Sequence, residues 1–244
     1  SELIADINKF SNNVMAQQLF LTLSVQPDVA GSFEQSRQRV LQWWHKRLPM
    51  YTAPTLDNGS GLSRQERIEV RSLSALLQLA AQGPLAQTFQ NSLSIVGVDG
   101  TVKHWMERSP HSQLQGKAWL KTGSLRDVAA VAGYVQGRSG QRYSVVAIVN
   151  HEDAKRARPA LSALLEVGHA FPRWRGGRLL HPDLRDTSRI EVTQHGKQIM
   201  RSLPGIWRLR TPQHPRTQIA GRSLRPDPEV VGMHAQGLQT LMQL

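Results

Sequence analysis

The stretch Ala118-Trp119-Leu120-Lys121-Thr122-Gly123-Ser124 decides the fold of this chain. Its apolar first half predicts a strand over residues 117–124, which ends in an amine, a hydroxyl and a residue without a Cβ. Residues 129–136 and 142–150 are rich in Val, Ala, Ile and aromatic residues, and residues 137–140 join them with the composition of a hairpin turn. These three segments together predict an antiparallel sheet.

Helical segments flank these strands in the sequence. Residues 2–10 carry apolar side chains at helical spacing, and Ser63-Arg64-Gln65-Glu66 has the pattern of a capping box that begins a helix. The predicted helices cover residues 2–10, 14–25, 33–48 with Ser32 as the cap, 63–82, a short segment from Pro84, and 152–168. Several helices, a strand cluster and a final helix predict an α+β (mixed α and β) fold, with the sheet packed against a helical cluster.

The charge is unevenly distributed along the 244 residues. The whole chain carries a net charge of +12, and residues 172–244 hold 12 Lys and Arg against 5 Asp and Glu, together with 7 of the 13 prolines. This change in composition predicts a boundary near Pro172. Residues 1–171 are expected to form the folded domain, and residues 172–244 a basic Arg/Pro-rich, irregular tail that is poorly ordered and has no core of its own.

Composition also limits the chemistry. The absence of cysteine excludes disulfides and thiolate chemistry, and the nine histidines show no metal-ligand spacing, so no metal site is predicted. No stretch approaches the roughly 20 apolar residues of a membrane span. No signal peptide is recognisable, and because the chain begins with Ser1 it is expected to be a truncation.

A second polar motif, Ser11-Asn12-Asn13, lies 110 residues before Lys121, at the predicted turn between two helices. Short polar side chains at such a turn can point into a cleft. Ser11 can pass a proton to a leaving nitrogen, and Asn13 can hold a substrate amide through its own amide. The motif therefore complements the polar end of the strand that contains Lys121.

The end of that strand suits a peptide that terminates in a carboxylate. Lys121 supplies a positive charge, Thr122 a hydroxyl donor, and Gly123 permits close approach to the backbone. An extended peptide can pair with the strand edge, and the backbone N–H of Ser124 can point at a developing oxyanion. These residues predict acyl-transfer chemistry on a peptide.

Three stretches carry a resemblance to a known family: residues 8–16, residues 57–64, and residues 121–125 leading to Ala132-Gly133-Tyr134-Val135. Through them residues 1–171 resemble the C-terminal part of the penicillin-binding/transpeptidase-like domain of class C low-molecular-mass penicillin-binding proteins. This is the serine-type D-Ala-D-Ala carboxypeptidase/endopeptidase family, with motifs S-x-x-K, S-x-N and K-T-G. The resemblance implies a serine β-lactamase-like fold and periplasmic hydrolysis of peptidoglycan stem peptides. It also implies covalent capture by β-lactams and no metal or organic cofactor.

The resemblance also assigns roles to residues. Ser11 and Asn13 match the second motif, Lys121, Thr122 and Gly123 the third, and Ser124 the oxyanion position. The first motif is missing, because no serine in the chain is followed three residues later by lysine. In the family that motif lies far upstream, so the chain is expected to be an incomplete fragment that is inactive alone.

Two other functions remain open at this stage. The chain can be a non-catalytic fragment that binds peptidoglycan peptides, or, less in keeping with its motifs, a basic protein that binds nucleic acid through phosphate neutralisation. Against the latter, the arginines form no helical stripe. The Asp57-Asn58-Gly59 loop either borders the active site or is an ordinary tight loop. The oligomeric state and the preference for carboxypeptidase or endopeptidase cleavage stay open.

Overall fold

The computed structural model describes residues 2–170 and 217–223, and its centre is a five-stranded sheet. The strands follow the order β1-β2-β3-β4-β5, and each pairs antiparallel with its neighbour. Their bounds are β1 Ser94–Ile95, β2 Ala118–Leu125, β3 Val128–Gln136, β4 Arg142–Asn150 and β5 Thr217–Ser223. The predicted antiparallel sheet is confirmed.

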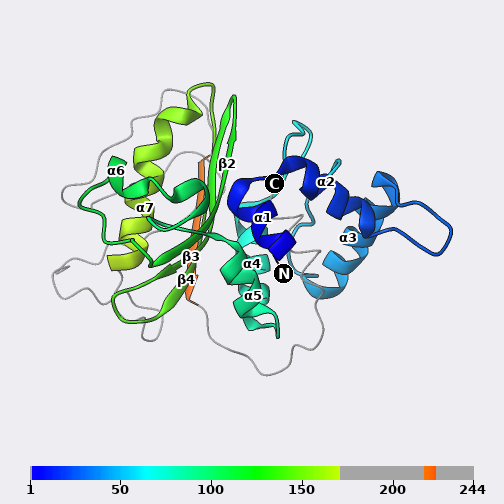
Figure 1. The fold of residues 1–244 in the computed structure, drawn as a ribbon, viewed down its shortest axis with the longest axis horizontal. Helices are drawn as coiled ribbons and strands as arrows, with labels where there is room; N and C mark the ends of the chain where they lie inside the picture. Colours follow the sequence, from blue (N-terminus) through cyan, green and yellow to red (C-terminus); the bar gives the residue numbers. More distant parts are fainter. Residues whose placement is uncertain (1, 171–216, 224–244) are drawn as a thin grey trace.

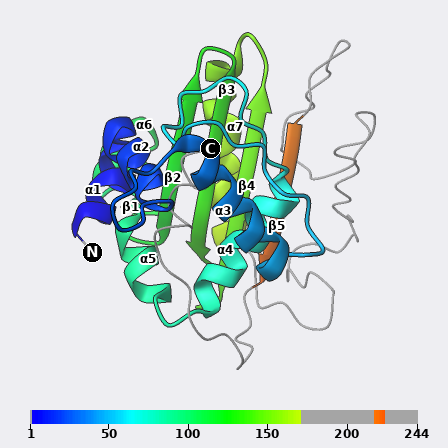
Figure 2. The ribbon, with the colours of Figure 1, turned by 90° about the vertical axis from the view of Figure 1, so that its right-hand side faces the viewer.

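Helices cover both faces of the sheet. They are α1 Glu2–Phe10, α2 Asn13–Thr22, α3 Phe33–Arg47, α4 Val70–Gln82, α5 Ala86–Ser92, α6 Trp105–Arg108 and α7 Arg158–Ala170, with the 3-10 turns η1 Gly100–Val102 and η2 Ala154–Ala157. Helices α1 to α5 gather on one side of the sheet and α6 and α7 on the other (Figure 1), and α7 runs behind the sheet in the perpendicular view (Figure 2). The predicted α+β fold, with a sheet against a helical cluster, is confirmed.

Two apolar cores hold these layers together. The helical-side core surrounds Trp44, Leu76 and Phe89 and includes Tyr134 of β3, whereas the α7-side core includes Leu120 of β2. Because successive side chains of a strand point to opposite faces, β2 contributes to both cores. This alternation sends the side chain of Lys121 to the helical side.

The helix predicted to begin at Ser63 begins at Val70 instead. Residues 63–69 do not form its first turns, and Arg67 pairs with Thr55 in an isolated bridge. The carboxylate of Glu66 accepts the backbone N–H of Asp57 at 3.2 Å rather than capping a helix. The capping-box prediction was therefore wrong, because a contact with a distant loop satisfies the glutamate.

Other differences are short elements without a strong sequence signal. The sequence predicted neither β1 nor α6, which hold two and four residues. Strand β5 lies within the segment expected to be irregular and pairs with β4. The remainder of that segment lies outside the described residues. Within the described part of the chain, no helix combines the length and apolarity needed to cross a membrane.

Candidate active site

The amine of Lys121 joins the sheet to the turn between α1 and α2. Its Nζ donates to the Ser11 Oγ at 2.6 Å and to the Thr122 backbone oxygen at 2.8 Å. Lys121 is only 6% exposed although it lies in the middle of β2, just beyond the residues that β1 covers. The structure thus brings together the two residues that the sequence placed 110 positions apart.

Ser11 reaches this position because the chain turns sharply between the two helices. Its φ of 51° lies in the left-handed region, which is uncommon for a residue with a Cβ. Asn12 then caps α2, accepting the Met15 backbone N–H at 3.0 Å, and its own N–H donates to the Ile7 oxygen at 3.1 Å. Backbone strain of this kind often accompanies functional positions and persists only where the surroundings enforce it.

Burial changes the acidity of the Lys121 amine. Loss of hydration disfavours the charged form and lowers the pKa of Lys121 from 10.5 to about 8. No carboxylate of the described residues forms an ion pair with this amine. At neutral pH Lys121 is therefore a positive charge without an anionic partner in this part of the chain, suited to attract a carboxylate ligand.

Asn13 connects the same corner to the loop at residues 57–61. Its Nδ2 donates to the Ser60 backbone oxygen at 2.5 Å, and the Ser60 N–H donates to the Asn58 Oδ1 at 3.0 Å. The loop therefore borders the corner formed by Ser11 and Asn13. The Asp57 side chain instead accepts from Asn58 at 3.3 Å.

The carboxylate of Glu66 holds this loop through hydrogen bonds to its backbone. Besides Asp57, its carboxylate is approached by the backbone N–H groups of Asn58 and Gly59, and burial raises the pKa of Glu66 above 4.5 despite these bonds. An anionic acceptor that serves several backbone donors fixes a loop without regular structure.

We expect Glu66→Ala to lower the free energy of unfolding by about 1–2 kcal/mol, because loop N–H groups lose their buried acceptor. Glu66→Gln keeps an acceptor oxygen and removes the buried charge, so its stability should stay within about 0.5 kcal/mol of wild type. Urea unfolding of the three proteins at pH 7 measures both effects. Equal losses in the two variants would contradict the assigned role.

The edge of β2 beyond β1 is open in the described structure. Val96 donates its N–H to the Ala118 oxygen at 3.0 Å, so the backbone groups of Ala118 point away from β3. Because these groups alternate along an antiparallel strand, those of Thr122 and Ser124 point the same way. β1 pairs only with residues before Lys121, so no described strand covers the edge beside Thr122 and Ser124.

The side chains along this edge differ in their surroundings. The Thr122 hydroxyl lies 3.0 Å from that of Thr101, and Ser124 is exposed. A Cβ on Gly123 would meet the Ala130 Cβ at 3.5 Å, an ordinary contact. Nothing else among the described residues lies within 4 Å of that position, so the close approach predicted at Gly123 stays a prediction.

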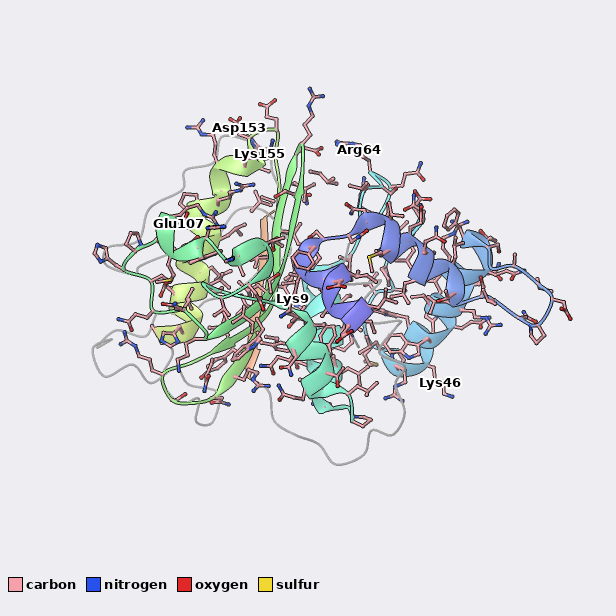
Figure 3. The ribbon with its side chains drawn as sticks, viewed as in Figure 1. Lys9, Lys46, Arg64, Glu107, Asp153 and Lys155 are labelled. Carbon is pink, nitrogen blue, oxygen red and sulfur yellow. The ribbon has the colours of Figure 1, made fainter. Side chains whose placement is uncertain are left out.

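One ion pair links the two sides of the site. Arg64, beyond the loop at residues 57–61, lies 2.6 Å from Asp127 in the turn between β2 and β3. Both side chains are substantially exposed, so the pair contributes little to stability. Figure 3 shows Arg64 at the outer end of its loop.

The sequence missed several residues that hold the predicted ones in place. They are Ser60, Glu66 and Thr101. The Ser60 backbone oxygen accepts from Asn13, the Glu66 carboxylate accepts from the loop rather than capping a helix, and the Thr101 hydroxyl contacts Thr122. The turn at Asp99-Gly100 marked the position of Thr101, whereas the local pattern around Glu66 indicated a helix cap instead. Tertiary contacts alone bring Ser60 and Glu66 to the site.

Comparisons with known proteins agree with this geometry. The model of the D-Ala-D-Ala carboxypeptidase 3 (S13) family matches residues 1–167. The chain is 29% identical over 205 residues to a D-alanyl-D-alanine carboxypeptidase of Actinomadura sp. (strain R39), covering 79% of this chain and 37% of that protein. It is 26% identical over 152 residues to the D-alanyl-D-alanine carboxypeptidase DacB of Haemophilus influenzae, covering 61% and 31%.

Solved structures show the shared fold. The crystal structure of penicillin binding protein 4 (dacB) from Haemophilus influenzae matches with a TM-score of 0.57 at 22% identity, covering 67% of this chain and 39% of that one. The same protein complexed with a novel β-lactam matches with a TM-score of 0.56 at 24% identity, covering 68% and 40%. The chain thus spans between 31% and 40% of the length of these relatives. By its match over residues 1–167, the chain belongs to the D-Ala-D-Ala carboxypeptidase 3 (S13) family.

Proposed function

We propose that this chain is the part of a serine-type D-Ala-D-Ala carboxypeptidase/endopeptidase that supplies the substrate-binding and proton-transfer residues. The observation that carries the proposal is the 2.6 Å hydrogen bond between Lys121 Nζ and Ser11 Oγ, beside an open strand edge. The nucleophilic serine and lysine of the S-x-x-K motif belong to a segment that this sequence does not contain. The substrates are peptidoglycan stem peptides and β-lactams, and the location is the periplasm.

Peptide binding uses the open edge of β2. A stem peptide in extended form pairs with the backbone groups beside Thr122 and Ser124 as an added strand. Its terminal carboxylate lies near the Lys121 amine and the Thr122 hydroxyl, and the Asn13 amide holds an amide of the peptide. The positive charge of Lys121, which has no anionic partner among the described residues, favours this carboxylate.

The reaction is acyl transfer through an ester intermediate. The serine oxygen attacks the carbonyl carbon of the D-Ala-D-Ala bond, and the Ser124 N–H stabilises the resulting oxyanion. As the C–N bond breaks, Ser11 donates its hydroxyl proton to the leaving nitrogen and receives the proton taken from the nucleophile by the lysine of the first motif. The amine of Lys121 holds the Ser11 oxygen in place throughout. Water then hydrolyses the ester.

The chain alone lacks the nucleophile and is therefore expected to bind without cleaving. The 244-residue chain should show no covalent labelling by a fluorescent penicillin, whereas the longer protein that includes an upstream S-x-x-K serine should be labelled. Denaturing gel fluorescence measures both. A stable label on the short chain would show that the nucleophile lies within it and would overturn the proposed division of roles.

A further inference from the structure

The turn Asp99-Gly100-Thr101 lies between the end of α1 and strand β2, and the proposed mechanism does not use it. The Asp99 Oδ2 lies 2.5 Å from the Lys9 Nζ, two residues before Ser11. The Asp99 Oδ1 accepts the Ile95 N–H at 2.7 Å. Figure 3 shows Lys9 between α1 and the sheet. The Asp99 carboxylate therefore joins the helix that leads to Ser11 to the end of β1.

Gly100 allows the turn to approach α1 closely. Its φ is +59°, and a Cβ there would lie 2.2 Å from the Ser94 Oγ and 2.9 Å from the Lys9 backbone oxygen. Only a residue without a side chain fits this space. The close approach places Thr101, the next residue, against the side chain of Thr122.

A series of hydroxyl groups runs from this turn to the open strand edge. The Ser94 Oγ donates to the Lys9 oxygen at 3.4 Å and receives the Thr101 N–H at 3.3 Å. The Thr101 Oγ1 lies 3.5 Å from the Ser94 Oγ and 3.0 Å from the Thr122 Oγ1. Each hydroxyl has one proton.

A ligand fixes the direction of this hydroxyl series. Either hydroxyl of the Thr101–Thr122 pair can be the donor in its absence, but once a carboxylate accepts the Thr122 proton, only Thr101 can donate between the two. Thr122 then accepts from Thr101 and keeps its own proton for a ligand at the strand edge. Thr101 is itself exposed, so this contact is accessible from the open side of the site.

We propose that Thr101 is a positioning residue that orients the Thr122 hydroxyl to donate to the terminal carboxylate of the peptide substrate. This inference rests on the proposed function, because it names what prepares the Thr122 hydroxyl for that carboxylate. Thr101 acts through Thr122, so its contribution to binding disappears when Thr122 has no hydroxyl.

The test is a double-mutant cycle on peptide binding by the 244-residue chain. The dissociation constant of N-acetyl-D-alanyl-D-alanine is measured at pH 7 by NMR titration for wild type, Thr101→Val, Thr122→Val and the double variant. The same peptide with a C-terminal amide serves as the ligand control, and Thr101→Ser as the matched variant. Unfolding midpoints are measured for every variant.

We expect Thr101→Val to weaken binding of the acid about five-fold, the order of one hydrogen bond. Thr101→Ser should bind as wild type, and Thr101→Val should add nothing in the Thr122→Val background. Binding of the amide should not change. An unaltered affinity in Thr101→Val, or an equal loss with and without the Thr122 hydroxyl, would overturn the positioning role while leaving the proposed function intact. If wild type does not prefer the acid and Thr122→Val has no effect, the proposed carboxylate recognition fails and this role with it.

Discussion

Replacement of Lys121 by alanine is expected to slow acylation by a penicillin about 10²–10³-fold in the longer protein that carries the S-x-x-K serine. The substitution removes both the charge that we propose to face the ligand carboxylate and the donor that holds the Ser11 oxygen. Losing one preorganised electrostatic group of an acyl-transfer site has an effect of this order. The measurement is the rate of fluorescent penicillin labelling under conditions where the chemical step is observed.

Lys46→Ala is the matched control for this experiment. Lys46 is an exposed lysine on α3, on the side of the helical cluster away from the sheet (Figure 3). The Lys46→Ala substitution removes one positive charge, as Lys121→Ala does, but leaves the corner at Ser11 unchanged. The labelling rate of this variant should therefore equal that of wild type. If Lys121→Ala also labels at the wild-type rate, Lys121 has no part in acylation.

The same lysine is expected to reduce stability. A pKa lowered from 10.5 to about 8 means that charged Lys121 is less favourable in the folded protein than in the unfolded chain. The difference corresponds to about 3 kcal/mol. We therefore expect Lys121→Met to raise the free energy of unfolding by up to about 3 kcal/mol at pH 7, although the variant loses function.

The lowered pKa also predicts how the stability difference between Lys121→Met and wild type changes with pH. Between pH 8 and 10.5 the unfolded chain binds more protons at Lys121 than the folded protein does, so wild-type stability rises with pH across this range. The advantage of Lys121→Met should be full below pH 8 and shrink toward pH 10.5. Urea unfolding of both proteins at pH 7 and pH 10 measures the difference. An advantage that is absent at pH 7, or that grows with pH, would contradict the stated cause.

The sequence predicted those parts of the site whose chemistry lies in neighbouring residues. The apolar run before Lys121 identified the strand, and the polar turn around Ser11 identified a break between two helices, and both are present. Local pattern suffices in these cases because strand alternation and helix capping depend on residues close in the chain.

Local sequence patterns did not predict the contacts between segments that are distant in the chain. Glu66 satisfied the pattern of a helix cap, but the loop at Asp57 offers it several backbone donors instead. Thr101 had the sequence of a plain turn, and the pairing of β1 with β2, together with the close approach of Gly100 to α1, sets it beside Thr122. In both cases, tertiary structure determines which of several possible partners a polar side chain meets.

The 110-residue separation between the two halves of the Lys121–Ser11 contact has a consequence for how the protein folds. Closing so long a loop is entropically unfavourable until the intervening helices and strands have docked. No partly folded form containing only the first helices or only the hairpin can possess this contact. Recovery of the peptide binding that we propose should therefore coincide with the slowest step that restores native fluorescence, and this binding would then serve as a probe of complete folding.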